Sequence, residues 1–208
     1  NLVADTSSGP KPNYLIVAFS GEEMGLLGSS FFAENMQDLD LEPRYMINLD
    51  RVGRLKDGRL AVSGVGTTPA WTDLIHEKAC NELKIKTSQS GVGPSDHTSF
   101  YYQEIPVLHF FTGTHEDYHK PSDDTEKINF EGETQILGYI LGLVYETRSL
   151  ENLPYTATKD ESTKAPKFSV TLGVMPDYMF EGEGMRLDGV TTDKPAAAAG
   201  LQKGDVVT

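Results

Sequence analysis

The sequence predicts an α/β domain with a largely parallel central sheet, followed by a smaller β-rich unit. Short apolar runs alternate with segments of helical periodicity up to about residue 150. Strands buried on both faces read as continuous apolar runs, and their alternation with helices builds a layered α/β fold. A polar stretch comes next, and short β-like pieces with several glycines follow it. We therefore divide the chain into a domain at 1–150, a linker at 151–167 and a truncated β-rich unit at 168–208.

Four apolar runs predict the strands of the first domain. They lie at 14–19, 45–49, 60–63 and 105–111. Helices are predicted at 25–36, from Pro69 onward and from 129 to about 148. Proline suits the first turn of a helix because it has no N–H group to lose there. In the last part of the chain, a short helix is predicted around 196–199 and a strand begins near its end.

Composition narrows the classes of function. Acidic residues outnumber basic ones 31 to 18, for a formal charge of −13, which argues against nucleic-acid binding. The same charge favours metal ions and peptide amino termini, although a surface adapted to solubility explains it equally well. Cys80 is the only cysteine, so a metal would be held by His, Asp and Glu side chains. No apolar run is long enough to span a bilayer.

The start of the chain carries no recognisable signal peptide. It also does not begin with methionine. We therefore expect a mature, trimmed or internal start, and secretion remains compatible with the sequence.

Acidic residues follow the first two predicted strands. Glu22 and Glu23 come directly after the first strand, and Asp50 ends the second. Ligands of open α/β sheets collect at the carboxyl ends of strands. Each feature also has a structural explanation, because acidic residues suit the first turn of a helix and Asp forms turns.

Two further segments place polar residues at the same predicted edge. A glycine-rich loop at 91–97 ends in Asp96 and His97. After the fourth strand, the segment 113–124 holds His115, Tyr118 and His119 among several acids. A single histidine is more often structural than a ligand, but four such segments at successive strand ends are less easily explained by chance and indicate a common site.

Five ordered motifs in this sequence resemble those of the M28 family of zinc aminopeptidases. Their order and spacing agree with the family over roughly residues 13–150. The motifs are FSGEEMGLLGS at 19–29, INLD at 47–50, SDHTSF at 95–100, IPV at 105–107 and DYHKPSD at 117–123. The resemblance implies a three-layer zinc-exopeptidase-like fold with a parallel or mixed sheet, and hydrolysis of N-terminal residues from peptides.

The resemblance also implies roles for individual residues. Glu22 matches the general base, and Tyr118 matches a hydrogen-bond donor to the developing oxyanion. Three residues match ligands of a two-zinc site: Glu23, Asp50 and His119. A zinc pair acidifies water and polarises the peptide carbonyl.

Other polar residues of the same segments receive lesser roles. Asp96 matches an acidic residue that either contacts the metal ligands without binding the metal itself or lies beside the substrate. His97, His109 and His115 are interpreted as structural.

One departure from the family pattern concerns metal binding. The family carries a His-x-Asp motif and a metal-bridging Asp ahead of the segment that corresponds to Tyr14, and this sequence contains neither. Asp5 lies too close to the first strand to be the bridging residue. We therefore expect the 208-residue segment alone to bind zinc poorly and to be inactive, with activity belonging to the intact protein. An exposed sheet edge is expected as well.

The last part of the chain resembles a PDZ domain. The pattern PAAAAGLQKGD at 195–205, the segment 170–175 and the segment 184–190 are similar to PDZ elements. A PDZ groove receives an extended peptide by strand addition. A β-rich extension without a binding role is the alternative.

Two other functions are compatible with the sequence. The first is a non-catalytic peptide-binding protein on a peptidase fold, and the second is glutaminyl cyclisation at a related one-zinc site. The family resemblance also suggests a secreted, periplasmic or cell-envelope location. Peptides with free N-termini are the expected partners, together with a possible peptide ligand of the PDZ-like tail. Substrate preference and oligomeric state are not encoded in any motif.

Overall fold

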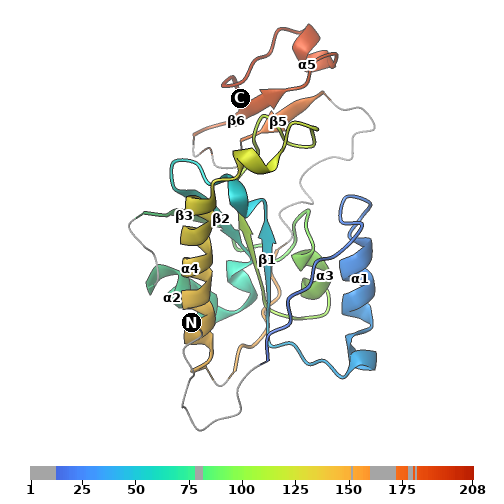
Figure 1. The fold of residues 1–208 in the computed structure, drawn as a ribbon, viewed down its shortest axis with the longest axis vertical. Helices are drawn as coiled ribbons and strands as arrows, with labels where there is room; N and C mark the ends of the chain where they lie inside the picture. Colours follow the sequence, from blue (N-terminus) through green and yellow to red (C-terminus); the bar gives the residue numbers. More distant parts are fainter. Residues whose placement is uncertain (1–12, 78–81, 151, 160–171, 178–179, 181) are drawn as a thin grey trace.

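The first domain is a mixed sheet covered by helices on both faces (Figure 1). The computed structural model describes residues 13–77, 82–150, 152–159, 172–177, 180 and 182–208. Cys80 and residues 160–167 of the predicted linker lie outside this set. Within it, the predicted α/β class is confirmed.

The sheet contains four strands in the order β1-β4-β2-β3. Their bounds are β1 Met46–Asp50, β2 Arg59–Ser63, β3 Lys84–Thr87 and β4 Val107–Phe111. β1 and β4 are parallel, β2 and β3 are parallel, and β2 and β4 are antiparallel. The sheet is therefore mixed, as the family resemblance implies, with two parallel pairings and one antiparallel pairing. The sequence does not predict β3, because KIKT is not a continuous apolar run. In the structure this strand is correspondingly only partly buried.

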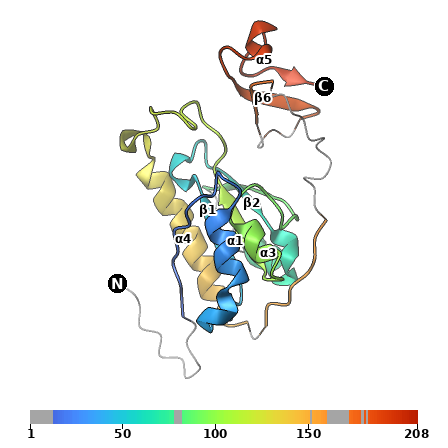
Figure 2. The ribbon, with the colours of Figure 1, turned by 90° about the vertical axis from the view of Figure 1, so that its right-hand side faces the viewer.

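Helices form a layer on each side of the sheet (Figures 1 and 2). One layer holds α2 Pro69–Glu77 and α4 Phe130–Thr147, and the other holds α1 Leu27–Glu34 and α3 His97–Tyr101. Leu108 and Phe110 of β4 pack in the α2/α4 cluster, whereas Val107 packs in the α1/α3 cluster. Successive side chains of a strand point to opposite faces of the sheet, which explains this alternation. Short 3-10 helices lie at η1 Met36–Leu39, η2 Val52–Arg54, η3 Val65–Thr67 and η4 Thr125–Lys127.

The first predicted strand is wrong. Residues 14–19 have no strand assignment, and Ile16 is 97% exposed. A strand requires hydrogen bonds from a neighbour, and among the residues described only β4 pairs with β1, which lies at the edge of the sheet. Phe19 is the exception in this run, because its ring packs 5.6 Å from that of Phe32 and 5.9 Å from that of Phe100.

The segment that follows α4 packs on the first domain. Leu153 is buried in the α2/α4 cluster, and the Thr156 amide donates to the Thr67 carbonyl over 2.8 Å. The Thr158 amide donates to the Tyr101 hydroxyl, also over 2.8 Å. The first half of the predicted linker is thus held against the domain.

The C-terminal unit is β-rich, as predicted. It consists of β5 Val174–Pro176, β6 Met185–Val190, α5 Pro195–Ala198 and β7 Val206–Val207. The strands form an antiparallel sheet in the order β5-β6-β7, with Leu187 and Ala196 buried. The Thr114 hydroxyl donates to Asp188 Oδ2 over 2.9 Å, which connects this unit to the first domain.

Among the residues described, no helix combines the length and the apolar character that a membrane span requires.

Candidate active site

The candidate residues lie at the edge of the sheet where two parallel strands end. Asp50, the last residue of β1, is paired in register with Phe111, the last residue of β4. The segment at 112–124, which we call the His119 loop, therefore leaves the sheet beside Asp50. This placement agrees with the rule that ligands bind beyond the carboxyl ends of strands.

A tight turn positions the two glutamates. The Glu22 carbonyl accepts from the amides of Gly25 and Leu26 over 3.0 and 2.9 Å, and this turn leads directly into α1. A Cβ atom on Gly28 would lie 2.5 Å from the Ser20 carbonyl oxygen, so glycine is required for the close approach. The turn therefore carries Glu22 and Glu23 on a constrained backbone.

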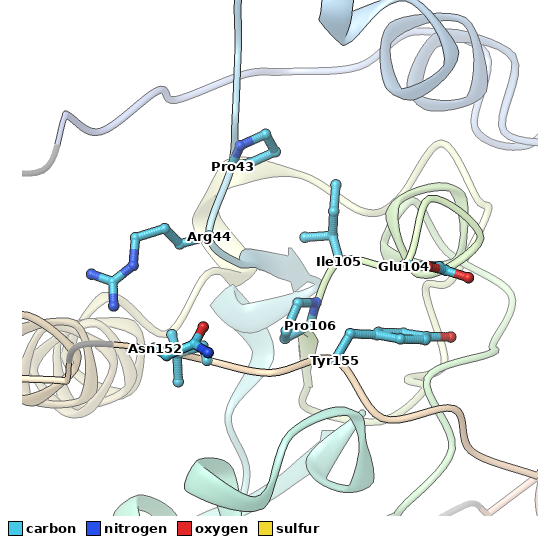
Figure 3. Close-up of a pocket in the computed structure, with 8 residues that line it drawn as sticks. Pro43, Arg44, Glu104, Ile105, Pro106, Asn152 and Tyr155 are labelled. Atoms are coloured by element: carbon cyan, nitrogen blue, oxygen red, sulfur yellow. The ribbon is translucent and has the colours of Figure 1, made fainter.

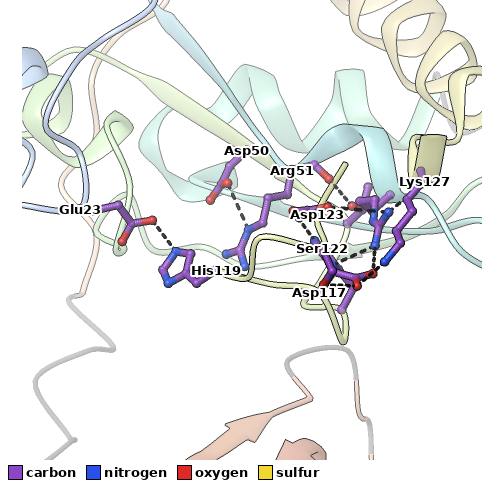
Figure 4. Close-up of polar contacts among 11 residues, drawn as sticks. Glu23, Asp50, Arg51, Asp117, His119, Ser122, Asp123 and Lys127 are labelled. Atoms are coloured by element: carbon purple, nitrogen blue, oxygen red, sulfur yellow. Dashed lines mark hydrogen bonds and ion pairs between the residues drawn. The ribbon is translucent and has the colours of Figure 1, made fainter. Parts of the chain in front are cut away.

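Glu23 and His119 are in direct contact. His119 Nε2 lies 2.6 Å from Glu23 Oε1, although 96 residues separate them in sequence (Figure 4). The two side chains are 53% and 67% exposed. The Tyr118 ring stacks on the His119 ring with centroids 3.8 Å apart. Two predicted ligands from different elements thus meet at the sheet edge.

Asp50 has two basic neighbours. Arg51 Nε donates to Asp50 Oδ1 over 3.3 Å, and His109 Nε2 lies 3.5 Å from Asp50 Oδ2. Burial raises the pKa of Asp50, but the contacts with His109 and Arg51 outweigh it, so the pKa lies below its ordinary value. The Asp50 carboxylate is therefore ionised at neutral pH.

The pKa of Glu22 is raised, in contrast to that of Asp50. Burial raises the pKa of Glu22, and the negative charges of Glu23, Asp50 and Asp96 raise it further. The pKa of the Tyr118 hydroxyl is also raised, first by burial and then by nearby carboxylates, while Arg51 opposes the shift. Glu22 is thereby suited to proton transfer, and Tyr118 stays protonated and able to donate a hydrogen bond.

The His119 loop is held by the Asp117 carboxylate. Lys127 and Ser122 donate to Asp117 Oδ1, and Arg54 Nη2 donates to Oδ2 over 2.7 Å. These hydrogen bonds, that of Lys127 foremost, keep the pKa of Asp117 well below its ordinary value. The network fixes the loop segment that immediately precedes Tyr118 and His119.

The remaining histidines pack in the interior or against the loop. The His97 ring is fully buried and stacks on the His109 ring with centroids 4.4 Å apart. Burial lowers the pKa of His97 well below its ordinary value, so this ring is neutral. His115 Nδ1 lies 3.1 Å from Arg54 Nη2.

Asp96 lies at the start of α3, and its Oδ1 atom is buried without a hydrogen-bond partner among the residues described. It is close enough to Glu22 to raise that residue's pKa. The structure therefore brings Asp96 toward the glutamates without a direct contact.

The donor types fit zinc, which takes imidazole and carboxylate ligands. Their arrangement is only partly that of a metal site. In the described part of the chain, no group of three or more His, Cys, Asp or Glu side chains is placed to hold an ion. Glu23 instead pairs with His119, and Asp50 pairs with Arg51.

Sequence reasoning missed Arg51 and the contact of His109 with Asp50. Neither residue belongs to a motif that predicts a contact. The available signal was positional: Arg51 directly follows Asp50 at a strand end, and His109 lies in the adjacent strand.

A surface cavity of ≈ 240 Å³ lies at the other end of β1 and β4 (Figure 3). It is lined by residues that precede these strands and by the segment after α4, among them Arg44, Pro106 and Tyr155. None of the candidate site residues lines it. This cavity is therefore separate from the site at the carboxyl ends.

The comparisons with known proteins find a peptidase family and several aminopeptidases. The model of peptidase family M28 matches residues 1–144. A curated relative, aminopeptidase YwaD of Bacillus subtilis, is 29% identical over 160 residues, which cover 72% of this chain and 35% of the relative. The chain therefore spans about a third of the length of that relative.

Solved aminopeptidase structures show the same fold. BSAP, a zinc aminopeptidase from Bacillus subtilis, superposes with a TM-score of 0.52 at 28% identity over 64% of this chain and 35% of that chain. The aminopeptidase from Aneurinibacillus sp. strain AM-1 gives a TM-score of 0.52 at 27% identity, over 68% of this chain and 35% of that chain.

Proposed function

The chain belongs to peptidase family M28, and we propose that it supplies the general base and part of the metal site of a zinc aminopeptidase. The observation that carries this proposal is the contact between Glu23 and His119, together with Asp50 at the end of the adjoining strand. This contact and the position of Asp50 support one site built from three distant segments, with Glu22 in the same turn as Glu23.

Glu23, Asp50 and His119 are the residues that would bind zinc. Their ligand types and common location support this assignment. A bound zinc ion, of which the family resemblance implies two, would lower the pKa of a water molecule and polarise the scissile carbonyl. Opening of the Glu23–His119 and Asp50–Arg51 pairs would free Glu23, His119 and the Oδ1 atom of Asp50 for this purpose.

Glu22 would act as the general base. Its raised pKa brings the carboxyl closer to neutrality, where a group can accept a proton and then release it. Glu22 would take a proton from the attacking water and transfer it to the leaving amine. Tyr118, with its hydroxyl kept protonated, would donate a hydrogen bond to the oxyanion that develops on the carbonyl. Asp96 would add negative charge on the substrate side and attract the peptide's amino terminus.

The C-terminal unit would form a second, PDZ-like module that binds a peptide. Its antiparallel sheet and the short helix α5 support this assignment. In the described residues, β5 pairs only with β6, and an extended peptide added along its other edge would continue the sheet.

The test is release of p-nitroaniline from amino-acid anilides by the intact, zinc-loaded protein. Glu22→Gln should lower kcat by roughly 10²- to 10⁴-fold while zinc content, measured by elemental analysis, stays unchanged. Glu34→Gln is a matched control, because Glu34 is an exposed glutamate at the end of α1. Unchanged turnover in Glu22→Gln would reject the assignment and favour a non-catalytic peptide-binding role.

A further inference from the structure

Arg51 places a fixed positive charge within a group of carboxylates. It follows Asp50 directly, and its backbone is in the left-handed region with φ 52° and ψ 34°. Its carbonyl accepts a hydrogen bond from the Thr112 hydroxyl. The residue is therefore held at the end of β1, and its side chain is directed toward the His119 loop.

Aromatic rings hold the Arg51 guanidinium in place. Its central carbon lies 4.1 Å from the centroid of the Tyr118 ring and 4.5 Å from that of the Phe111 ring. The side chain is only 24% exposed, and Figure 4 shows it between Asp50 and His119. A guanidinium stacked on two rings keeps one orientation at low entropic cost.

One nitrogen of the Arg51 guanidinium lacks a hydrogen-bond acceptor among the residues described. Its Nε atom donates to Asp50 over 3.3 Å, but its Nη1 atom is buried without an acceptor among the residues described. No ion pair joins it to Glu22, Glu23 or Asp96 in this part of the chain. A buried charged donor without an acceptor is costly. The guanidinium therefore lacks an acceptor at Nη1, and a carboxylate is its best-matched partner.

The same Tyr118 ring connects Arg51 to the proposed chemistry. Tyr118 is assigned to the oxyanion, and its ring covers the guanidinium at 4.1 Å. A group bound to Arg51 therefore lies close to the scissile carbonyl. Only a few bonds separate that carbonyl from an acidic side chain of the N-terminal residue, or from the C-terminal carboxylate of a dipeptide.

On this basis, and resting on the proposed aminopeptidase function, we propose that Arg51 binds a substrate carboxylate next to the scissile bond. The site then selects peptides with an N-terminal Asp or Glu, or free dipeptides. A neutral side chain of the same shape leaves the buried guanidinium without this acceptor and is disfavoured.

The experiment compares kcat/KM within pairs of substrates in the intact, zinc-loaded protein. Glutamyl and glutaminyl p-nitroanilides differ only in the side-chain carboxylate, and Leu-Gly and leucyl-glycinamide differ only in the C-terminal carboxylate. One of the two ratios should favour the acid by about tenfold or more. Arg51→Met should bring that ratio to one or below, whereas Arg51→Lys should retain part of the preference.

Arg44→Met is the matched control, because Arg44 precedes β1 at the opposite end of the strand, and it should keep the ratio. Each ratio is independent of how much of a variant folds or loads zinc. The glutamyl pair identifies the side chain as the source of the carboxylate, and the dipeptide pair identifies the C-terminus. If the protein cleaves these substrates but both ratios are one, or if Arg51→Met leaves them unchanged, this inference is overturned. If nothing is cleaved, the proposed function itself fails.

Discussion

Asn129 stabilises helix α4 through both the oxygen and the nitrogen of its side-chain amide, and its replacement gives a measurable test of the fold. Asn129 Oδ1 accepts from the Gly132 amide over 2.9 Å at the start of α4. Its Nδ2 group donates to the Leu55 carbonyl over 2.8 Å. The second bond connects α4 to the segment that follows Asp50 and Arg51, so Asn129 also supports the site.

Asn129→Ala removes both interactions. Loss of an N-cap costs about 1 kcal/mol, and loss of the bond to Leu55 adds about 0.5–1.5 kcal/mol. Because Asn129 is exposed at the surface, we expect the free energy of unfolding to fall by about 2 kcal/mol rather than by the upper limit of this sum. Asn129→Ser is the matched control, since its hydroxyl keeps an acceptor for the cap and loses only the bond to Leu55.

The assay is urea unfolding of the 208-residue chain, followed by the fluorescence of Trp71. This residue is the only tryptophan in the sequence and is fully buried against the Tyr45 ring. With the usual dependence of the unfolding free energy on urea concentration, Asn129→Ala should lower the unfolding midpoint by about 1 M. The Asn129→Ser midpoint should lie clearly closer to that of the wild type. Equal midpoints for the two variants would refute the capping argument.

Two further predictions concern the His119 loop and the exposed segment before the site. Asp117→Asn should lower stability at neutral pH, because the folded-state pKa of Asp117 lies below its unfolded value. That contribution is present above the ordinary carboxyl pKa and is lost as the pH falls through the folded value, so urea midpoints of variant and wild type should converge in acid. A constant difference from neutral to acidic pH would contradict this. In the 208-residue chain, Ile16→Glu should change the free energy of unfolding by less than about 0.5 kcal/mol, since Ile16 is 97% exposed. A loss as large as that of Asn129→Ala would instead support the buried strand that the sequence predicted.

Local patterns were sufficient for the elements with a strong signal of their own. The apolar runs that gave β1, β2 and β4, and the apolar periodicity that gave α4, contain the information needed to identify them. The order of the family motifs likewise predicts a common site for Glu22, Glu23 and His119, and the structure brings the last two into contact. The family assignment is confirmed by the match to residues 1–144, whereas the individual catalytic roles stay predictions.

The errors came from elements whose environment is set by other segments. Residues 14–19 have the composition of a buried strand, yet composition alone cannot provide the neighbouring strand that such a run needs. The reverse holds for β3, because KIKT forms a strand only through its pairing with β2. The antiparallel pairing of β2 with β4 was also not encoded in any local signal.

Sequence patterns alone are enough to predict the family, most helices and strands of the first domain, and the acidic and histidine segments from which a site could form. The contact of His119 with Glu23, and the position of Arg51 against Tyr118 and beside Asp50, become visible only in the folded chain. This difference arises from the range of the interactions. Helix periodicity and strand burial are properties of consecutive residues, whereas a charge pair depends on backbone paths that bring together residues far apart in the chain.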